Sequence, residues 1–582
     1  MVCNYIGLAT TPHDPALAIV NSKGEVVFAE ATERYLQNKR AWCSSPEDII
    51  RTKGLLEKYC DKNADLVIAT TWTKQYIYLN KMLFLNPLRK YLVKILFNES
   101  SKQEQIKWTH HLAMIASFYN PHAGETISAQ MYQTDPLIRI NKRTYDHHLT
   151  HAAAACYSSP FNEGICAIID GHGEGVSTSF YQYKNGKITS LSRRLKSRES
   201  LGLYYITLCR LCGFSSTKGE EWKVMGLAAY GKYDENIYKI LQSLLTVKEG
   251  VLVEGKDSKL ARIKLNELRV EPDDDPLKAA DLAYTGQLFY CDIVIKLLED
   301  LYRHGISDNL ILGGGCALNS SCNGILMEKT SFKKLHVYSA PADDGNAVGA
   351  ALLAYYEDNP PQPQRSLAKF QTPYLGETMS PKSLAHLKKY NGLKALDITK
   401  EYVPQKTAEL LAQGKIIGWV QGRAEFGPRA LGNRSILADP RAVDIKDRLN
   451  ITVKFREEFR PFAPSILHEY GDEYFENYQE SPYMERTLRF KKEKINEVPG
   501  VVHIDGTGRL QTVKREWNEK FYELILAFKK ITGIPLVLNT SFNVMGKPII
   551  HTVEDAVAVF QTSGLDVLVI EDQIYIKENN FS

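Results

Sequence analysis

Alternating runs of apolar and polar residues divide the first part of the chain into short strands and turns. They predict strands over 5–9, 16–20 and 26–29, with a polar loop at 10–15 and a turn at 22–24. The same order returns further along, with strands predicted over 165–169, 178–183 and 188–191, a polar loop at 170–175 and a turn at 185–186. Because internal repetition says more about a fold than a single motif does, we infer a duplicated three-strand unit.

A repeated unit that opens each time on a polar loop is typical of the actin-like ATPase (ASKHA) architecture, in which the two loops face each other across a nucleotide cleft. The glycine-rich turn expected there follows an apolar run as Gly313, Gly314 and Gly315. Glycines let the backbone approach a ligand, and the N-terminus of a following helix favours an anion. Asn319 and Asn323 are four residues apart and could bond ribose or phosphate, although capping the helix is the alternative.

Two histidines four residues apart follow Asp146. On a helix, His147 and His151 would project from one face toward one point. Asp170 ends a later apolar run, and two neutral imidazoles with carboxylates suit iron, zinc or manganese. One of Asp343 and Asp344, at the start of an alanine-rich helix, could complete this metal site while the other caps the helix. The alternative is a pair of ordinary helix histidines.

The chemistry of the sequence changes after a proline-rich, polar stretch near residue 360. We predict a two-lobed actin-like domain over 1–358, a linker over 359–366 and a second α/β domain over 367–582. Arginines framed by glycine and proline crowd 422–435 and 454–464, and polar loops follow at 503–509 and 538–543. Arginine forks match phosphate and carboxylate geometry, so we predict an anion pocket, with solvated surface arginines as the alternative.

The overall charge is close to neutral. The 582 residues include 72 basic and 68 acidic ones, a formal net charge of +4, which argues against a general nucleic-acid binder. No stretch approaches the roughly 18 uncharged apolar residues of a membrane span. The N-terminal residues lack the basic and apolar pattern of a secretory signal. Ten scattered cysteines are typical of a reduced, cytoplasmic protein.

Nearly end to end, the chain resembles the O-carbamoyltransferases of the NodU/CmcH type. The stretches that carry the resemblance in the first half are 13–14, 147–152, 170–171, 223–227, 315–319 and 343–345, and those in the second half are 427–435, 459–464 and 538–543. Such enzymes pair an actin-like domain, similar to the tRNA threonylcarbamoyl-transfer enzymes and in that sense Kae-like, with a C-terminal YrdC-like α/β domain. The resemblance therefore implies both folds.

For the C-terminal domain, the resemblance implies that carbamoyl phosphate and ATP, with Mg²⁺, are converted to carbamoyl adenylate. The positions that match the family's substrate-binding residues there are Arg429, Arg434, Lys454, Arg509, Asn539 and Ser541. Lys223 and Arg460 lie in matching motifs and are predicted to bind substrate or nucleotide as well. These cations would offset the charge of carbamoyl phosphate and of the triphosphate, and Arg509 is predicted to be catalytic.

For the N-terminal domain, the resemblance implies transfer of the carbamoyl group from the adenylate to an acceptor hydroxyl. His147, His151, Asp170 and Asp343 match the family's metal ligands, with iron or another divalent transition metal expected. That metal would polarise the adenylate as a Lewis acid. His13, next to Asp14, is by its motif a candidate general base, and both are predicted to be catalytic together with His147.

The expected partner is a small-molecule hydroxyl acceptor of the natural-product kind, whose identity the sequence does not give. We expect no nucleic-acid partner and no membrane association, and a homodimer stays open. The rival functions are an actin-fold small-molecule kinase, a tRNA threonylcarbamoyl-type transferase and a non-catalytic nucleotide-binding scaffold. The paired histidines and the arginine-rich second half argue against the kinase, and the near-neutral charge argues against the tRNA enzyme.

Overall fold

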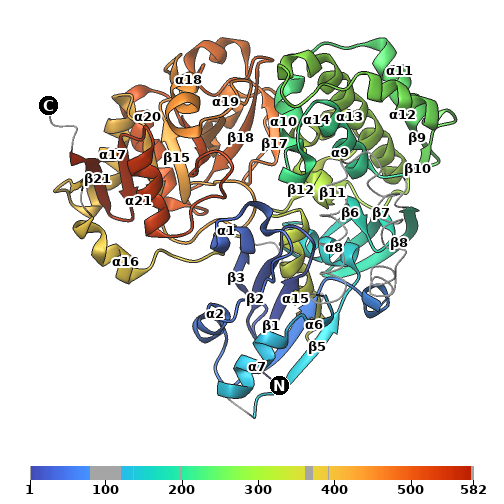
Figure 1. Cartoon of the computed structure of the whole chain (residues 1–582), viewed down its shortest axis with the longest axis horizontal. Coiled ribbons are helices and arrows are strands. Elements are labelled where there is room, and N and C mark those ends of the chain that lie inside the picture. Colours follow the sequence, from blue (N-terminus) through green and yellow to red (C-terminus); the bar gives the residue numbers. More distant parts are fainter. Residues whose placement is uncertain are drawn as a thin grey trace. The chain divides into compact units, whose positions relative to one another are not determined.

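The computed structural model describes residues 2–78, 120–134, 137–196, 199–360, 371–390 and 392–578 (Figure 1). Its contacts group these residues into two compact units. The first unit contains 1–198, 306–316 and 335–371, and the second contains 199–305, 317–334 and 372–582. The linker predicted over 359–366 lies largely outside the described residues, and the domain boundaries predicted from the sequence stay a prediction.

The first unit contains a five-stranded sheet near the N-terminus, in the order β3-β2-β1-β4-β5. Its strands are β1 (Cys3–Ala9), β2 (Ala16–Val20), β3 (Val26–Ala31), β4 (Asp65–Thr70) and β5 (Ile140–Thr144). The first three form an antiparallel meander, with Tyr5 opposite Val20, and β4 and β5 continue the sheet in parallel. The helices of this region are α1 (Thr32–Leu36), α2 (Thr52–Tyr59), α6 (Asn120–His122) and α7 (Glu125–Thr134).

The second sheet of the first unit repeats this topology, in the order β12-β11-β6-β7-β8. Its strands are β6 (Glu163–Gly173), β7 (Val176–Lys184), β8 (Lys187–Lys196), β11 (Asn309–Gly313) and β12 (Lys334–Val337). Again a meander of three strands is extended, as β11 pairs in parallel with β6 and β12 lies next to β11. The predicted duplication and the actin-like fold are thereby confirmed.

One predicted loop is mostly strand. Residues Asp170 to Gly173 continue β6 past a register shift, and the chain reverses only at Glu174 and Gly175. Both turn residues have positive φ, 53° and 81°, as a two-residue hairpin turn of type I′ requires. The prediction of a loop over 170–175 was wrong because its polar, glycine-rich sequence hides the strand pairing.

Two helices pack between the sheets of the first unit. Helix α8 (His147–Ser158) contacts β6 and β11, and α15 (Asn346–Asp358) contacts β1, β2 and β4. The helices approach so closely that a Cβ added to Gly349 would lie 1.9 Å from the carbonyl oxygen of Thr150. The small residues of α8, four of them consecutive alanines, permit this approach and fix the start of α8 against the strand ends.

The second unit begins with a helical region. It comprises α9 (Leu201–Leu211), α10 (Glu221–Ala228), α11 (Glu235–Leu244), α12 (Ser258–Glu267), α13 (Ala280–Tyr302), α14 (Ser320–Lys329) and the hairpin β9 (Leu245–Lys248) and β10 (Val251–Glu254). The apolar stripe of α13 is core, since Leu282, Phe289, Ile293 and Leu297 recur at helical spacing and are all buried.

A nine-stranded mixed sheet organises the rest of the second unit, in the order β13-β21-β20-β14-β15-β19-β16-β18-β17. Its strands are β13 (Leu393–Ala395), β14 (Ile417–Val420), β15 (Arg434–Ala438), β16 (Ala463–Leu467), β17 (Arg486–Arg489), β18 (Thr507–Val513), β19 (Leu536–Ser541), β20 (Val567–Ile570) and β21 (Gln573–Lys577). Its helices are α16 (Pro381–His386), α17 (Val403–Ala412), α18 (Ile445–Leu449), α19 (Gly471–Tyr474), α20 (Glu519–Thr532) and α21 (Val553–Thr562). This is the predicted C-terminal α/β fold, and its YrdC-like character stays a prediction.

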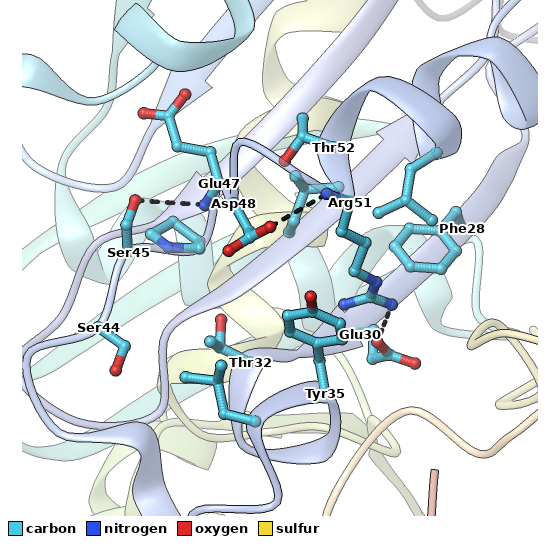
Figure 2. Close-up of a pocket in the computed structure, with 14 residues that line it drawn as sticks. Phe28, Glu30, Thr32, Tyr35, Ser44, Ser45, Glu47, Asp48, Arg51 and Thr52 are labelled. Atoms are coloured by element: carbon cyan, nitrogen blue, oxygen red, sulfur yellow. Dashed lines mark hydrogen bonds and ion pairs between the residues drawn. The ribbon is translucent and has the colours of Figure 1, made fainter. Parts of the chain in front are cut away.

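A cavity of about 260 Å³ lies beside β2 and β3 in the first unit. Figure 2 shows the Arg51 guanidinium in this cavity directed at the carboxylate of Glu30, with the Tyr35 ring 4.6 Å away. Glu47, also in the lining, accepts hydrogen bonds from the backbone N–H groups of Gly124 and Ile127 at the start of α7. These contacts attach the segment before α2 to the first sheet.

Within the described ranges, no helix combines the length and apolarity needed to cross a bilayer.

Candidate functional site

The first turn of α8 presents the paired histidines. Asp146 caps this helix, its side chain accepting a hydrogen bond from the Leu149 N–H at 2.9 Å. The cap fixes where the helix begins, so His147 and His151 lie one turn apart on the buried face. Their side chains are each only 1% exposed.

Two carboxylates from other elements meet these imidazoles. His147 Nε2 lies 3.7 Å from Asp170 Oδ2 and 3.6 Å from Asp343 Oδ1, and His151 Nε2 lies 3.4 Å from the same Asp343 oxygen. Asp170 comes from β6, and Asp343 from a short 3₁₀ turn, Asp343–Gly345, before α15. The four predicted ligands thus converge, each with one donor atom within 4.8 Å of the others.

The donor set fits one divalent metal ion. Ligand atoms that share an ion at about 2.1 Å stand roughly 3–3.5 Å apart, close to the distances found here. Both Nε2 atoms are buried without a hydrogen-bond partner in the described part of the chain. Buried polar atoms are rarely left so unless an ion or water completes them. The chemistry of two imidazoles and two carboxylates suits a transition metal, without specifying which.

The charges of the cluster agree with a cation site. Burial lowers the pKa of His147, but Asp170 and Asp343 outweigh it and raise the value to about 10. Burial raises the pKa of Asp343, but His147 and His151 hold it well below its usual value. Each carboxylate therefore stays ionised and calls for positive charge at the centre.

Neighbouring groups fix the ligands. The Gly315 N–H donates to Asp170 Oδ1 at 2.8 Å, which orients that carboxylate. The indole ring of Trp72 stacks on the imidazole of His147 with centroids 4.3 Å apart. Gly173 leaves the space that the imidazole of His147 occupies, because a Cβ there would lie 2.3 Å from His147 Cδ2.

The predicted general base lies beside this cluster. His13 Nδ1 is 2.8 Å from Asp14 Oδ2 and 3.9 Å from Asp343 Oδ2, and its side chain is 31% exposed. Burial raises the pKa of Asp14, but Arg40 and His13 together lower it to about 2. With Asp14 accepting the Nδ1 proton, Nε2 of His13 is left as the basic nitrogen. Asp14 has φ of 59°, a left-handed conformation that is uncommon outside glycine and often marks a functional turn.

The glycine-rich turn and its asparagines have structural contacts. A Cβ on Gly314 would lie 2.3 Å from the Ile169 carbonyl, and one on Gly313 would lie 2.8 Å from Ile168 Cδ1, so both let the turn approach β6. Asn319 caps α14 by accepting from the Cys322 N–H, the alternative left open by the sequence. Asn323 donates to two backbone carbonyls, of Ala317 and Glu485. Nucleotide binding by these residues stays a prediction.

In the second unit, two of the predicted arginines are half-buried cations without an ion pair among the described residues. Arg429 lies in the loop after β14, and Arg509 lies on β18. Burial lowers the pKa of Arg429 well below its usual value, and Arg509 lowers it further. Burial also lowers the pKa of Arg509 to about 10. Guanidinium groups stay charged in proteins, so these shifts express a cost that a bound anion would relieve.

Other predicted binding residues already have partners. Arg434, fully buried, donates to the carbonyls of Gln421, Asn433, Glu377 and Gly422. Lys454 Nζ donates to Ser541 and to Asn543, the latter through Oδ1 at 2.8 Å. Asn539 donates to Ser465 Oγ at 3.0 Å. These bonds shape the loops around the arginines, and direct contact with substrate stays a prediction for all four, Ser541 included.

Lys223 and Arg460 share a carboxylate. Lys223 Nζ is 2.7 Å from Glu457 Oε1, and Arg460 Nε is 2.9 Å from Glu457 Oε2. Arg456, in the same loop, stacks on Phe462 at 4.4 Å. Sequence reasoning missed the parts played by Glu457, Trp72, Gly173 and Arg40, since nothing in their local sequence separates them from ordinary residues.

The folds and sites together define a class, an actin-like domain with a buried cluster of two histidines and two aspartates, followed in the chain by an α/β domain with half-buried arginines. The family model for the carbamoyltransferase N-terminus matches residues 4–352, and that for the carbamoyltransferase C-terminus matches residues 408–577. The chain therefore belongs to the carbamoyltransferase family, and it is an enzyme that transfers the carbamoyl group.

Individual proteins are similar to this chain over most of its length. The chain is 37% identical over 434 residues to the nodulation protein NolO of Bradyrhizobium diazoefficiens, covering 73% of this chain and 77% of that one. It is 30% identical over 434 residues to nodulation protein U of Sinorhizobium fredii, covering 70% and 73%. An uncharacterised protein of Synechocystis is 34% identical over 618 residues, covering 99% and 97%.

Proposed function

We propose that this carbamoyltransferase is ATP-dependent and carbamoylates a hydroxyl group of a small-molecule natural product. The observation that carries the proposal is the pair of half-buried arginines, Arg429 and Arg509, which make no ion pair among the described residues and whose pKa values burial lowers. A carbamoyltransferase that used a neutral donor would gain nothing from partly desolvating two uncompensated cations. Phosphate-bearing donors offset their charge.

In the C-terminal half, carbamoyl phosphate and ATP are converted to carbamoyl adenylate. Water releases the phosphoryl group of carbamoyl phosphate as phosphate, and the oxygen of the resulting carbamate displaces pyrophosphate from the α-phosphorus of ATP. Arg429 and Arg509 hold the phosphate oxygens and stabilise the charge that develops on them. Mg²⁺ accompanies the ATP.

In the N-terminal half, the carbamoyl group passes from the adenylate to the acceptor. His13 Nε2 takes the proton of the acceptor hydroxyl, whose oxygen forms a bond to the carbamoyl carbon while AMP leaves. Asp14 keeps the His13 ring in the required tautomer. A metal ion held by His147, His151, Asp170 and Asp343 supplies Lewis-acid polarisation when bound.

The products of ATP separate this proposal from the kinase alternative. Purified enzyme with ATP, Mg²⁺ and carbamoyl phosphate should release pyrophosphate, and omitting carbamoyl phosphate should abolish the release. A kinase supplied with its hydroxyl acceptor would instead transfer the γ-phosphoryl group to it and form ADP whether or not carbamoyl phosphate is present. Release of ADP alone, or pyrophosphate release that does not depend on carbamoyl phosphate, contradicts the proposal.

A further inference from the structure

Four arginines of the second unit carry charges that act on one another, and we call them the arginine row: Arg429, Arg509, Arg456 and Arg460. The charge of Arg509 acts on Arg429 and on Arg456, and the charge of Arg460 also acts on Arg456. Each of these influences lowers a pKa, as expected for like charges brought together. Glu457 stands at the Arg460 end of the row, where it forms an ion pair with Arg460 at 2.9 Å. Its charge also acts on Arg456, whose pKa it raises.

The helix α10, from the first half of the sequence, holds this end of the row. Lys223 of α10 is buried, and its Nζ lies 2.7 Å from Glu457 and 2.8 Å from Glu220. Its neighbour Trp222 carries the Arg460 guanidinium over its ring, 3.9 Å from the centroid. A Cβ on Gly226 would lie 3.5 Å from Pro461, so the helix packs directly on the loop.

The negative charge of Glu457 can be offset either by Lys223 or by the arginine row. With Lys223 in place, one carboxylate oxygen faces the ammonium group and the other faces Arg460. Without Lys223, the whole charge of Glu457 would act on Arg460 and Arg456, and the row would attract an anion less strongly. Because Lys223 and Arg460 are buried and Glu457 is half-buried, solvent and salt screen these charge interactions less than they would at the surface.

We propose that Lys223 is a positioning residue that sets the anion affinity of the arginine row by neutralising Glu457. A segment from the actin-like half of the sequence thereby controls the charge of the donor-binding site in the C-terminal half. This inference rests on the proposed function. It differs from the role predicted from the sequence, in which Lys223 binds the substrate itself.

A double-mutant cycle on the full-length enzyme tests this role. The variants are Lys223→Met, Glu457→Gln and the pair combined, with Lys223→Arg as the conservative variant and the exposed Lys218→Met as the matched control. Pyrophosphate binding is measured by calorimetry, and the KM for carbamoyl phosphate by pyrophosphate release. Circular dichroism and thermal unfolding confirm that each variant is folded.

Lys223→Met should weaken pyrophosphate binding and raise the KM about tenfold or more, because the charge of Glu457 would then act on Arg460 and Arg456 without Lys223 to offset it. Adding Glu457→Gln should restore both to within about threefold of wild type, and Lys223→Arg and Lys218→Met should stay close to wild type. If Lys223 bound the anion directly, the double variant would be at least as weak as Lys223→Met.

That result would overturn the proposal, as would a Lys223→Met enzyme that binds pyrophosphate like wild type or a wild type that does not bind it. Failure of the proposed function looks different. Suppose that the four enzymes bind pyrophosphate in calorimetry as expected, but pyrophosphate release does not depend on carbamoyl phosphate. The proposed formation of carbamoyl adenylate is then refuted, while the role of Lys223 in anion binding stands.

Discussion

Gly173 should be required for metal binding although it is not a ligand. The space for its missing side chain is filled by His147, since a Cβ would lie 2.3 Å from His147 Cδ2 and 2.8 Å from His148 Cδ2. Ordinary van der Waals contact begins at 3.4 Å, so Gly173→Ala must displace the imidazole by about an ångström. Stacking of Trp72 on that ring, at 4.3 Å, restricts where it can go.

A displacement of this size exceeds the tolerance of a metal ligand, about 0.2 Å. We therefore expect Gly173→Ala to lower metal affinity at least as much as the loss of a supporting contact does, about 10–100-fold, or roughly 1.4–2.7 kcal/mol. Overpacking should in addition cost about 1–3 kcal/mol of folding stability.

The assay is a competitive titration of the metal-free enzyme with Co²⁺ against a chelator, followed by the visible absorption of the bound ion. Gly171→Ala is the matched control, because a Cβ there has no heavy atom within 4 Å. It should bind Co²⁺ like wild type. If Gly173→Ala binds the ion as tightly as Gly171→Ala while both are folded, the placement of His147 as a ligand is wrong.

Two further predictions concern the same half of the chain. Purified enzyme should carry about one transition-metal ion, and an iron-selective chelator in excess Mg²⁺ should stop transfer and spare pyrophosphate release; full transfer by metal-free enzyme would contradict this. Asp14 should stabilise the protein by roughly 2 kcal/mol, because its pKa falls from 3.8 to about 2 on folding. A folded-state pKa below the unfolded one gives stability above pH 4 that is lost as the pH falls toward 2. The difference in unfolding free energy between wild type and Asp14→Asn, measured in urea, should therefore shrink over that range. A constant difference would show that folding does not lower the pKa of Asp14.

The repeated sheets and the convergence of the two histidines with two carboxylates could be predicted from the sequence, because both leave periodic or spaced signals. Strand alternation located β1, β2 and β3, and the spacing of four placed His147 and His151 on one helix face. The choice of Asp343 came from the family resemblance, since Asp343 and Asp344 look alike in the sequence.

The roles of the individual arginines in the second unit could not be predicted from the sequence. A glycine-framed arginine has the same local sequence whether it makes no ion pair among the described residues, like Arg429, or donates to backbone carbonyls, like Arg434. Contacts between distant segments, such as Trp72 on His147 or Lys223 at Glu457, leave no local pattern at all. They arise only when the chain folds, so a single sequence does not contain them in readable form.

The central claim is that adenylate formation and carbamoyl transfer use different residues, and supplied carbamoyl adenylate tests it most directly. Arg509→Ala should lose carbamoyl phosphate-dependent pyrophosphate release by about 10²–10³-fold, yet carbamoylate the acceptor when given the adenylate. His147→Ala should release pyrophosphate and fail to carbamoylate the acceptor even with the adenylate. If the adenylate rescues both variants, or if folded His147→Ala releases no pyrophosphate, the two steps do not use different residues.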